Sequence, residues 1–194
     1  MPETLKATEA WRQHIGARIG AMNGMLDAAV KDLSLEQVNH RERPGVLPIA
    51  FSLAHVIGGQ DRTVATFVDR GPLLWESGSW SQRVGYAGVL PQRGTPMAAA
   101  EAIRFANLDA WREYQAGVFA RTDSAIANTP LERFDEVAIA DRPSGVAGSF
   151  LFAFIPSGPI RLMDVLEAYV FQHAARHLGE IEHARALVGL GGIS

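Results

Sequence analysis

The sequence predicts an all-α fold, a four-helix bundle with long inter-helix loops. Three observations support this class. The length of 194 residues suits one domain, four long segments carry apolar residues at helical spacing, and no segment shows a strong alternating strand pattern. We therefore expect a single helical bundle domain over residues 1–194.

The first predicted helix covers residues 3–31. Five apolar side chains recur along it at intervals of three or four residues, so they share one face. These residues are Ile15, Ile19, Met22, Leu26 and Val30. Gly16, Gly20 and Gly24 also recur every four residues, and each costs about 1 kcal/mol of helix stability relative to alanine. This row either lets a neighbouring helix approach closely or has arisen by chance.

Proline, threonine and glycine residues mark the other three helices. The second is predicted over residues 48–68, where Gly58 and Gly59 allow a close approach or a kink. The third is predicted from Thr95, its N-cap, to about residue 125. The fourth is predicted over residues 160–188 and ends at a glycine-rich stretch typical of helix C-termini.

Two connections are expected to be irregular. Residues 71–96 are rich in glycine and proline, so we expect a long loop with a function or with local structure of its own. On it, Trp75 and Trp80 either cap the mouth of a pocket or pack back on the bundle. Short strands are predicted at residues 137–140 and 150–155.

The composition excludes several classes of protein. Hydrophobic residues make up 47% and charged residues 20%, which is ordinary for a globular chain. A net charge of −3 argues against a nucleic-acid partner. The absence of cysteine excludes disulfides, thiolate metal sites and a cysteine nucleophile. We find no secretory signal and no long apolar run, so we expect a cytoplasmic protein without a membrane partner.

The strongest chemical signal is a pair of histidines, His173 and His177, on the fourth predicted helix. Four residues turn an α-helix by about 400°, so the two imidazoles lie within about 40° of each other. This spacing allows two histidines to chelate one transition metal. Leu166, Val170 and Ile181 share the same face, so both rings are expected to face the core, where they need hydrogen bonds or a metal.

His55 is the better candidate for a third ligand. It lies in an otherwise apolar stretch of the second helix, where it needs an internal partner. Taken alone, it is more simply explained as a core histidine bonded to a backbone carbonyl. Together with His173 and His177 it becomes a plausible third ligand. His14 and His40 are expected at the surface.

His183 is the competing candidate, because the three histidines of the fourth helix have the spacing found in metzincin proteases. The glutamate beside the first histidine of those proteases is replaced by Ala174, and Gly179 lies one residue too early. In an unbroken helix His183 lies about 80° from the face of His173. A protease needs the missing glutamate as its general base, so we reject this assignment and expect His183 at the surface or a helix end.

Two segments resemble a known family. The run EAYVFQHAARHLGEIEHARALVGL, residues 167–190, resembles the last helix of the DinB/YfiT-like metalloenzymes. The shared features are the histidine pair, the Gly-Glu-Ile step, a downstream arginine and a closing glycine. The stretch FSLAHVIGGQDR around His55 is similar to the family's second helix. The resemblance covers all four helices in order, but only these two segments carry it specifically.

The resemblance implies a DinB-like four-helix bundle in which His55, His173 and His177 hold a divalent metal ion, such as zinc or nickel. It also implies a transferase or isomerase that uses a low-molecular-weight thiol, such as bacillithiol or mycothiol, although many relatives have no known activity. Homodimers are common among relatives, so a homodimer is expected. A chain without cysteine has to take such a thiol from a cosubstrate.

Two further residues share faces with these histidines. Glu180 follows His177 by three residues and either orients a ligand or acts as a catalytic base; a solvated glutamate near a helix end is the alternative. Arg62 follows His55 by seven residues and either binds an anionic substrate or pairs with a neighbouring acid.

The sequence therefore leaves three functions open. The first is a metal-dependent transferase that acts on a small-molecule substrate with a low-molecular-weight thiol. The second is a non-catalytic metal or small-ligand binding bundle involved in stress response. The third is a helical interaction protein whose histidines are merely buried. Metal content separates the third from the others, and turnover separates the first from the second.

Overall fold

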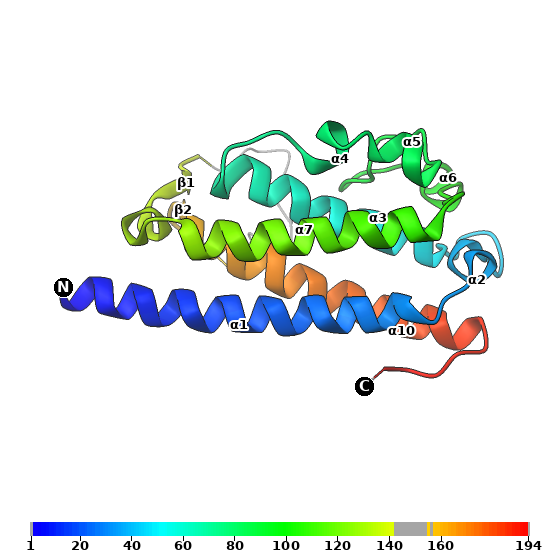
Figure 1. Ribbon diagram of the computed structural model, residues 1–194, viewed down its shortest axis with the longest axis horizontal. Helices are drawn as coiled ribbons and strands as arrows, with labels where there is room; N and C mark the ends of the chain where they lie inside the picture. The colour runs from blue at the N-terminus through cyan, green and yellow to red at the C-terminus, as the bar shows by residue number, and fades with distance from the viewer. Residues whose placement is uncertain (1, 142–154, 156, 194) are drawn as a thin grey trace.

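Four long helices lie side by side in the computed structural model, which describes residues 2–141, 155 and 157–193 (Figure 1). They are α1 (Glu3–Lys31), α3 (Ile49–Thr63), α7 (Leu108–Asn128) and α10 (His173–Leu187). α1 and α10 run in one direction and α3 and α7 in the other, and α1 and α3 each pack on both α7 and α10. The fold is therefore the predicted all-α bundle. None of the described helices has the length and apolar character needed to span a membrane.

Shorter elements join and extend these helices. The short helices are α2 (Leu35–Asn39), α4 (Leu74–Ser77), α5 (Trp80–Val84), α6 (Met97–Glu101), α9 (Leu162–Val165) and the 3-10 helix η2 (Leu131–Asp135). Two π-helical segments, η1 (Val64–Val68) and η4 (Leu166–Gln172), extend α3 and precede α10. Strands β1 (Val137–Ile139) and β2 (Ile160–Arg161) pair antiparallel.

The first helix forms as predicted. Its apolar stripe is buried against the core, with Met22 partly buried beside it. The row of glycines on this helix is not tightly packed against a neighbour. A side chain at Gly16 would meet Ile126 only at 3.8 Å, and Gly20 and Gly24 face open space. The packing of the described residues therefore does not require this row.

The prediction of one continuous helix from Thr95 is wrong. The chain forms the short α6 and breaks, and α7 begins only after Asn107, whose side-chain oxygen accepts a hydrogen bond from the Ala110 amide at 3.0 Å. Tertiary contacts hold the break, since the Phe105 amide donates to the side-chain oxygen of Asn39 at 2.9 Å. This bond to α2 replaces one that a continuous helix would form within itself.

The predicted long loop after η1 is partly helical, because a buried carboxylate caps α4 from outside. Asp61 on α3 is 1% exposed and accepts hydrogen bonds from the amides of Leu74 at 3.1 Å and Trp75 at 3.0 Å. These are first-turn amides that have no partner inside a helix. The same carboxylate also accepts from the Tyr114 hydroxyl and from Arg121, each at 3.1 Å. Asp61 thus ties α3, α4 and α7 together.

Both tryptophans of this connection pack back on the bundle. Trp75 is 7% exposed and Trp80 is 8% exposed. Their rings lie 5.0 Å and 5.7 Å from the ring of Tyr114 on α7. Of the two predicted roles, packing on the bundle is therefore the one that the structure confirms.

The last helical unit begins two residues later than predicted, because residues 160–161 form β2 instead. At its end Gly189 adopts a φ of +81°, as a glycine just beyond a helix commonly does. The amide of Leu190 then donates to the carbonyl of Arg185, which satisfies one of the last helical carbonyls. The strand predicted at 137–140 is confirmed as β1, and the one predicted at 150–155 lies outside the described residues except for Ile155.

Asp61→Ala should lower the free energy of unfolding by about 3–5 kcal/mol, because it leaves buried amides and Arg121 without their acceptor. Urea unfolding followed by circular dichroism measures the change. Glu113→Ala, which removes the exposed partner of Arg83, is the control and should change stability by no more than about 0.5 kcal/mol. Equal losses in both variants would contradict the role assigned to Asp61.

Candidate metal centre

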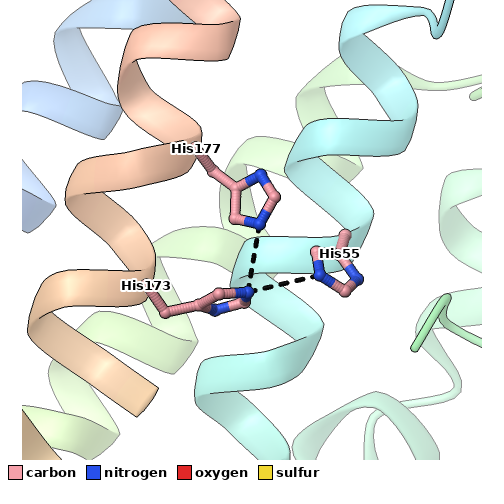
Figure 2. Close-up of side chains that lie close together, drawn as sticks. All are labelled: His55, His173 and His177. Atoms are coloured by element: carbon pink, nitrogen blue, oxygen red, sulfur yellow. Dashed lines mark hydrogen bonds between the residues drawn. The ribbon is translucent and has the colours of Figure 1, made fainter. Parts of the chain in front are cut away.

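Three histidines from two helices face one another in the bundle (Figure 2). His55 comes from α3, and His173 and His177 come from α10. The Nε2 atom of His173 lies 3.2 Å from Nε2 of His55 and 3.0 Å from Nε2 of His177. One ring nitrogen from each residue falls within 4.8 Å of the other two. The structure thus brings together the three histidines that the sequence singles out.

Two adjacent glycines of α3 lie at contacts with different neighbours, Gly59 with His173 and Gly58 with Leu90. A Cβ atom on Gly59 would lie 3.4 Å from Cε1 of His173, at the edge of ordinary van der Waals contact, so the ring of His173 packs beside this glycine. A Cβ atom on Gly58 would lie 2.9 Å from Cδ1 of Leu90, a distance that real Cβ atoms essentially never show. Of the alternatives open for this glycine pair, close approach is therefore the one observed.

In two of the three rings, the Nδ1 atom has a hydrogen-bond acceptor away from the centre. Nδ1 of His55 donates to the carbonyl oxygen of Pro91 at 3.3 Å, and Nδ1 of His177 donates to Oε2 of Glu180 at 2.7 Å. Carbonyl and carboxylate oxygens can only accept, so both Nδ1 atoms carry the hydrogen. In the neutral rings, the Nε2 atoms of His55 and His177 therefore present lone pairs to the centre.

This arrangement fits a metal ion. Only His173 can supply a hydrogen at the centre, and its Nε2 can donate to one neighbour at a time. The lone pair on the Nε2 atom of the other neighbour is then left without a hydrogen, and a central cation would satisfy it. Zinc–nitrogen bonds of about 2.0–2.1 Å in tetrahedral geometry place the nitrogens about 3.3 Å apart. The observed separations of 3.0 and 3.2 Å are close to that value.

Burial keeps the three rings neutral, the form that binds metals. Burial lowers the pKa of His173 to about 3, with a further contribution from the neighbouring His177 and His55. It lowers the pKa of His177 to about 4, even with the Glu180 carboxylate beside the ring. Burial also lowers the pKa of His55, against the opposing effect of its bond to Pro91.

The histidines open into a pocket of about 700 Å³. Phe67 from η1 and Tyr169 from η4 line it, so both π-helical segments contribute to its wall. Arg62, Arg93 and Arg176 line it as well. π-helical turns are frequent at functional sites. The volume lies in the range of small-molecule binding pockets.

The other residues singled out from the sequence lie at the surface or at the edge of the pocket. His14, His40 and His183 are exposed, as expected. Arg62 lines the same pocket as His55. Glu180 is exposed and contacts the outer side of His177.

Other residues were missed by sequence reasoning. Pro91 supplies a carbonyl from a distant connection, and no local pattern marks it. Arg93 lies on the same connection, and no local pattern marks it as a pocket residue either. Arg176 could have been found, because it follows His173 by three residues on the same helix. Arg185, the arginine of the family-like pattern, is structural, since it donates to both carboxylate oxygens of Asp32 and ties α10 to α1.

A helical bundle with three histidines converging from two of its long helices defines the class of this protein, a bundle with a candidate metal centre. The comparisons with known proteins identify its family. The family model described as the DinB superfamily matches residues 18–181, and the chain belongs to this superfamily.

A solved structure shows the same fold. The crystal structure of a conserved protein from Enterococcus faecalis superposes with a TM-score of 0.71 at 16% sequence identity, over 91% of this chain and 96% of that chain. No curated protein matches the chain significantly.

We expect the metal-free protein to lose stability as the pH falls from about 6.5 toward 4. The ordinary histidine pKa is 6.5, and burial lowers the pKa of His173 to about 3 and that of His177 to about 4. Below pH 6.5 the unfolded chain therefore binds more protons than the folded one. This contribution to stability is complete above 6.5 and is lost as the pH falls through the folded values.

Urea unfolding of chelated protein at several pH values measures this slope. His173→Asn should flatten it, because it removes one of the partly buried rings whose pKa burial lowers. His183→Asn is the matched control, because it removes an exposed histidine from the same helix and should leave the slope unchanged. The same slope in wild type and His173→Asn would contradict the assignment of this pH dependence to the histidines of the candidate centre.

Proposed function

We propose that this chain binds a divalent metal ion through His55, His173 and His177 and acts as a metal-dependent transferase with a low-molecular-weight thiol. One observation carries the metal proposal: three Nε2 atoms converge, and two of them belong to rings whose hydrogen lies on the outer nitrogen. Membership of the DinB superfamily and the adjoining pocket support it.

The chemistry of the proposal follows from the donor set. A divalent ion bound by three neutral imidazoles supplies a Lewis acid with open positions, which favours the thiolate form of a thiol near neutral pH. The chain has no cysteine, so the thiol comes from a cosubstrate. The pocket beside the histidines, about 700 Å³, has room for such a small molecule.

The protein's own groups hold the ligands in place. The Pro91 carbonyl fixes the ring of His55, and the Glu180 carboxylate fixes the ring of His177. Acceptors of this kind set the tautomer of a ligating histidine and raise its basicity. Of the roles predicted for Glu180, the 2.7 Å contact supports positioning of His177. A role as the catalytic base stays a prediction.

Metal content tests the first half of the proposal. After incubation with zinc or nickel and removal of the free ion, plasma mass spectrometry should find near-stoichiometric metal in the wild type. His173→Ala should lose most of it, because the Nε2 of His173 contacts both other rings. His183→Ala removes an exposed histidine of the same helix and should bind as the wild type does. Full stoichiometric binding by His173→Ala would refute the assignment.

Turnover tests the second half. The metal-loaded protein should accelerate the consumption of bacillithiol or mycothiol by an electrophile, and chelation should abolish the acceleration. His173→Ala should lose the activity together with its metal, and His183→Ala should keep it. Stoichiometric metal without turnover would instead favour the non-catalytic metal or small-ligand binding bundle. No metal at all would favour the interaction protein.

A further inference from the structure

Arginine side chains gather around the candidate metal centre. Arg62 extends from α3, Arg93 from the connection that carries Pro91, and Arg176 from the turn of α10 between the two histidines. All three line the same pocket as the histidines. No aspartate or glutamate lines that pocket in the part of the chain that the structure describes. The described lining therefore carries three positive charges, and Glu180, which is not part of the lining, contacts Arg176 and His177 from outside it.

The three arginines differ in their ion pairs and hydrogen bonds. Elsewhere in the bundle arginines pair with acids, as Arg185 does with Asp32. Arg176 is exposed, and its guanidinium lies 3.8 Å from the carboxylate of Glu180. Arg62 and Arg93 form no hydrogen bond or ion pair with the residues that the structure describes. Of the two roles predicted for Arg62, pairing with a neighbouring acid is thus not the one observed.

A guanidinium beside a pocket preferentially binds oxyanions. Its planar set of donors matches the two oxygens of a carboxylate or the oxygens of a phosphate. Arg62 is half-buried, so its charge is screened less than that of a fully exposed side chain. A cation held by the three neutral imidazoles would add to the positive potential.

A second, smaller pocket helps to place the anion. It measures about 350 Å³, and Arg62 forms part of its wall as well. Glu76 lines this smaller pocket and would repel an anion there. The oxyanion is therefore better accommodated on the histidine side of Arg62, where Arg93 is the second cation. Phe67 and Tyr169 offer apolar surface to the rest of the ligand on the same side.

We propose that Arg62 and Arg93 form an anion subsite beside the three histidines and that the substrate or cosubstrate is a small molecule bearing a carboxylate or phosphate group. This inference deepens the proposed function and rests on it for the reaction, because the subsite would hold one end of the molecule whose other end reacts at the histidines. The binding step itself needs only the arginines.

The test measures binding rather than turnover. Succinate and inorganic phosphate are titrated separately into the wild type, loaded with zinc or chelated, and binding is followed by NMR chemical-shift changes. We expect one or both probes to bind the chelated protein, which removes direct contact with the metal as an explanation. Arg62→Gln should weaken that binding roughly tenfold, the effect of losing one charge-assisted hydrogen bond. Preference for one probe identifies the oxyanion.

A control variant and a second subsite variant complete the test. Arg43→Gln removes an exposed arginine that lines neither pocket and should bind both probes as the wild type does. Arg93→Gln tests the same subsite from the connection, in case Arg62→Gln fails to fold by circular dichroism. Failure of both probes to bind the chelated wild type, or unchanged binding by both pocket variants, would overturn the proposal. Binding that depends on Arg62 in a protein that takes up no metal would preserve the subsite and refute the metal-dependent function.

Discussion

A buried carboxylate, Asp61, holds together three elements of the bundle, α3, α4 and α7. From the middle of the bundle it accepts hydrogen bonds from the first turn of α4, from Tyr114 and from Arg121 on α7. Removing one partner of such a buried group costs several kcal/mol, roughly 3–5. The chain after η1 is thereby fixed over α3. Further along the same connection, Leu90 rests on Gly58 and Pro91 reaches His55.

The chemistry of the centre depends on that connection. In two of the three neutral imidazoles, a hydrogen-bond acceptor away from the centre sets the tautomer, so that Nε2 presents a lone pair to the centre. For His177 the acceptor is local, because Glu180 lies three residues further along α10. For His55 the acceptor is the Pro91 carbonyl, which is 36 residues away in the chain. The same connection contributes Arg93, so one segment both orients a candidate ligand and adds positive charge to the pocket.

Local patterns predicted the candidate site better than they predicted the helix boundaries. The spacing of His173 and His177 places both rings on one face of a helix whatever surrounds it. The third helix was placed too early, because the proline after Thr95 does begin a helix, but only the short α6. The bond from Phe105 to Asn39 that holds the break joins residues far apart in the chain, so no local signal reveals it.

The sequence by itself determined the helical class, the inward face of the histidine pair and the absence of a cysteine thiol, because helical periodicity and amino-acid composition do not depend on tertiary contacts. Only the tertiary structure decided that His55 meets that pair, since this requires α3 and α10 to pack at Gly59. It also decided that Arg62 has no acid partner among the residues that the structure describes, because the acid next to it in sequence, Asp61, is buried and bound to Arg121.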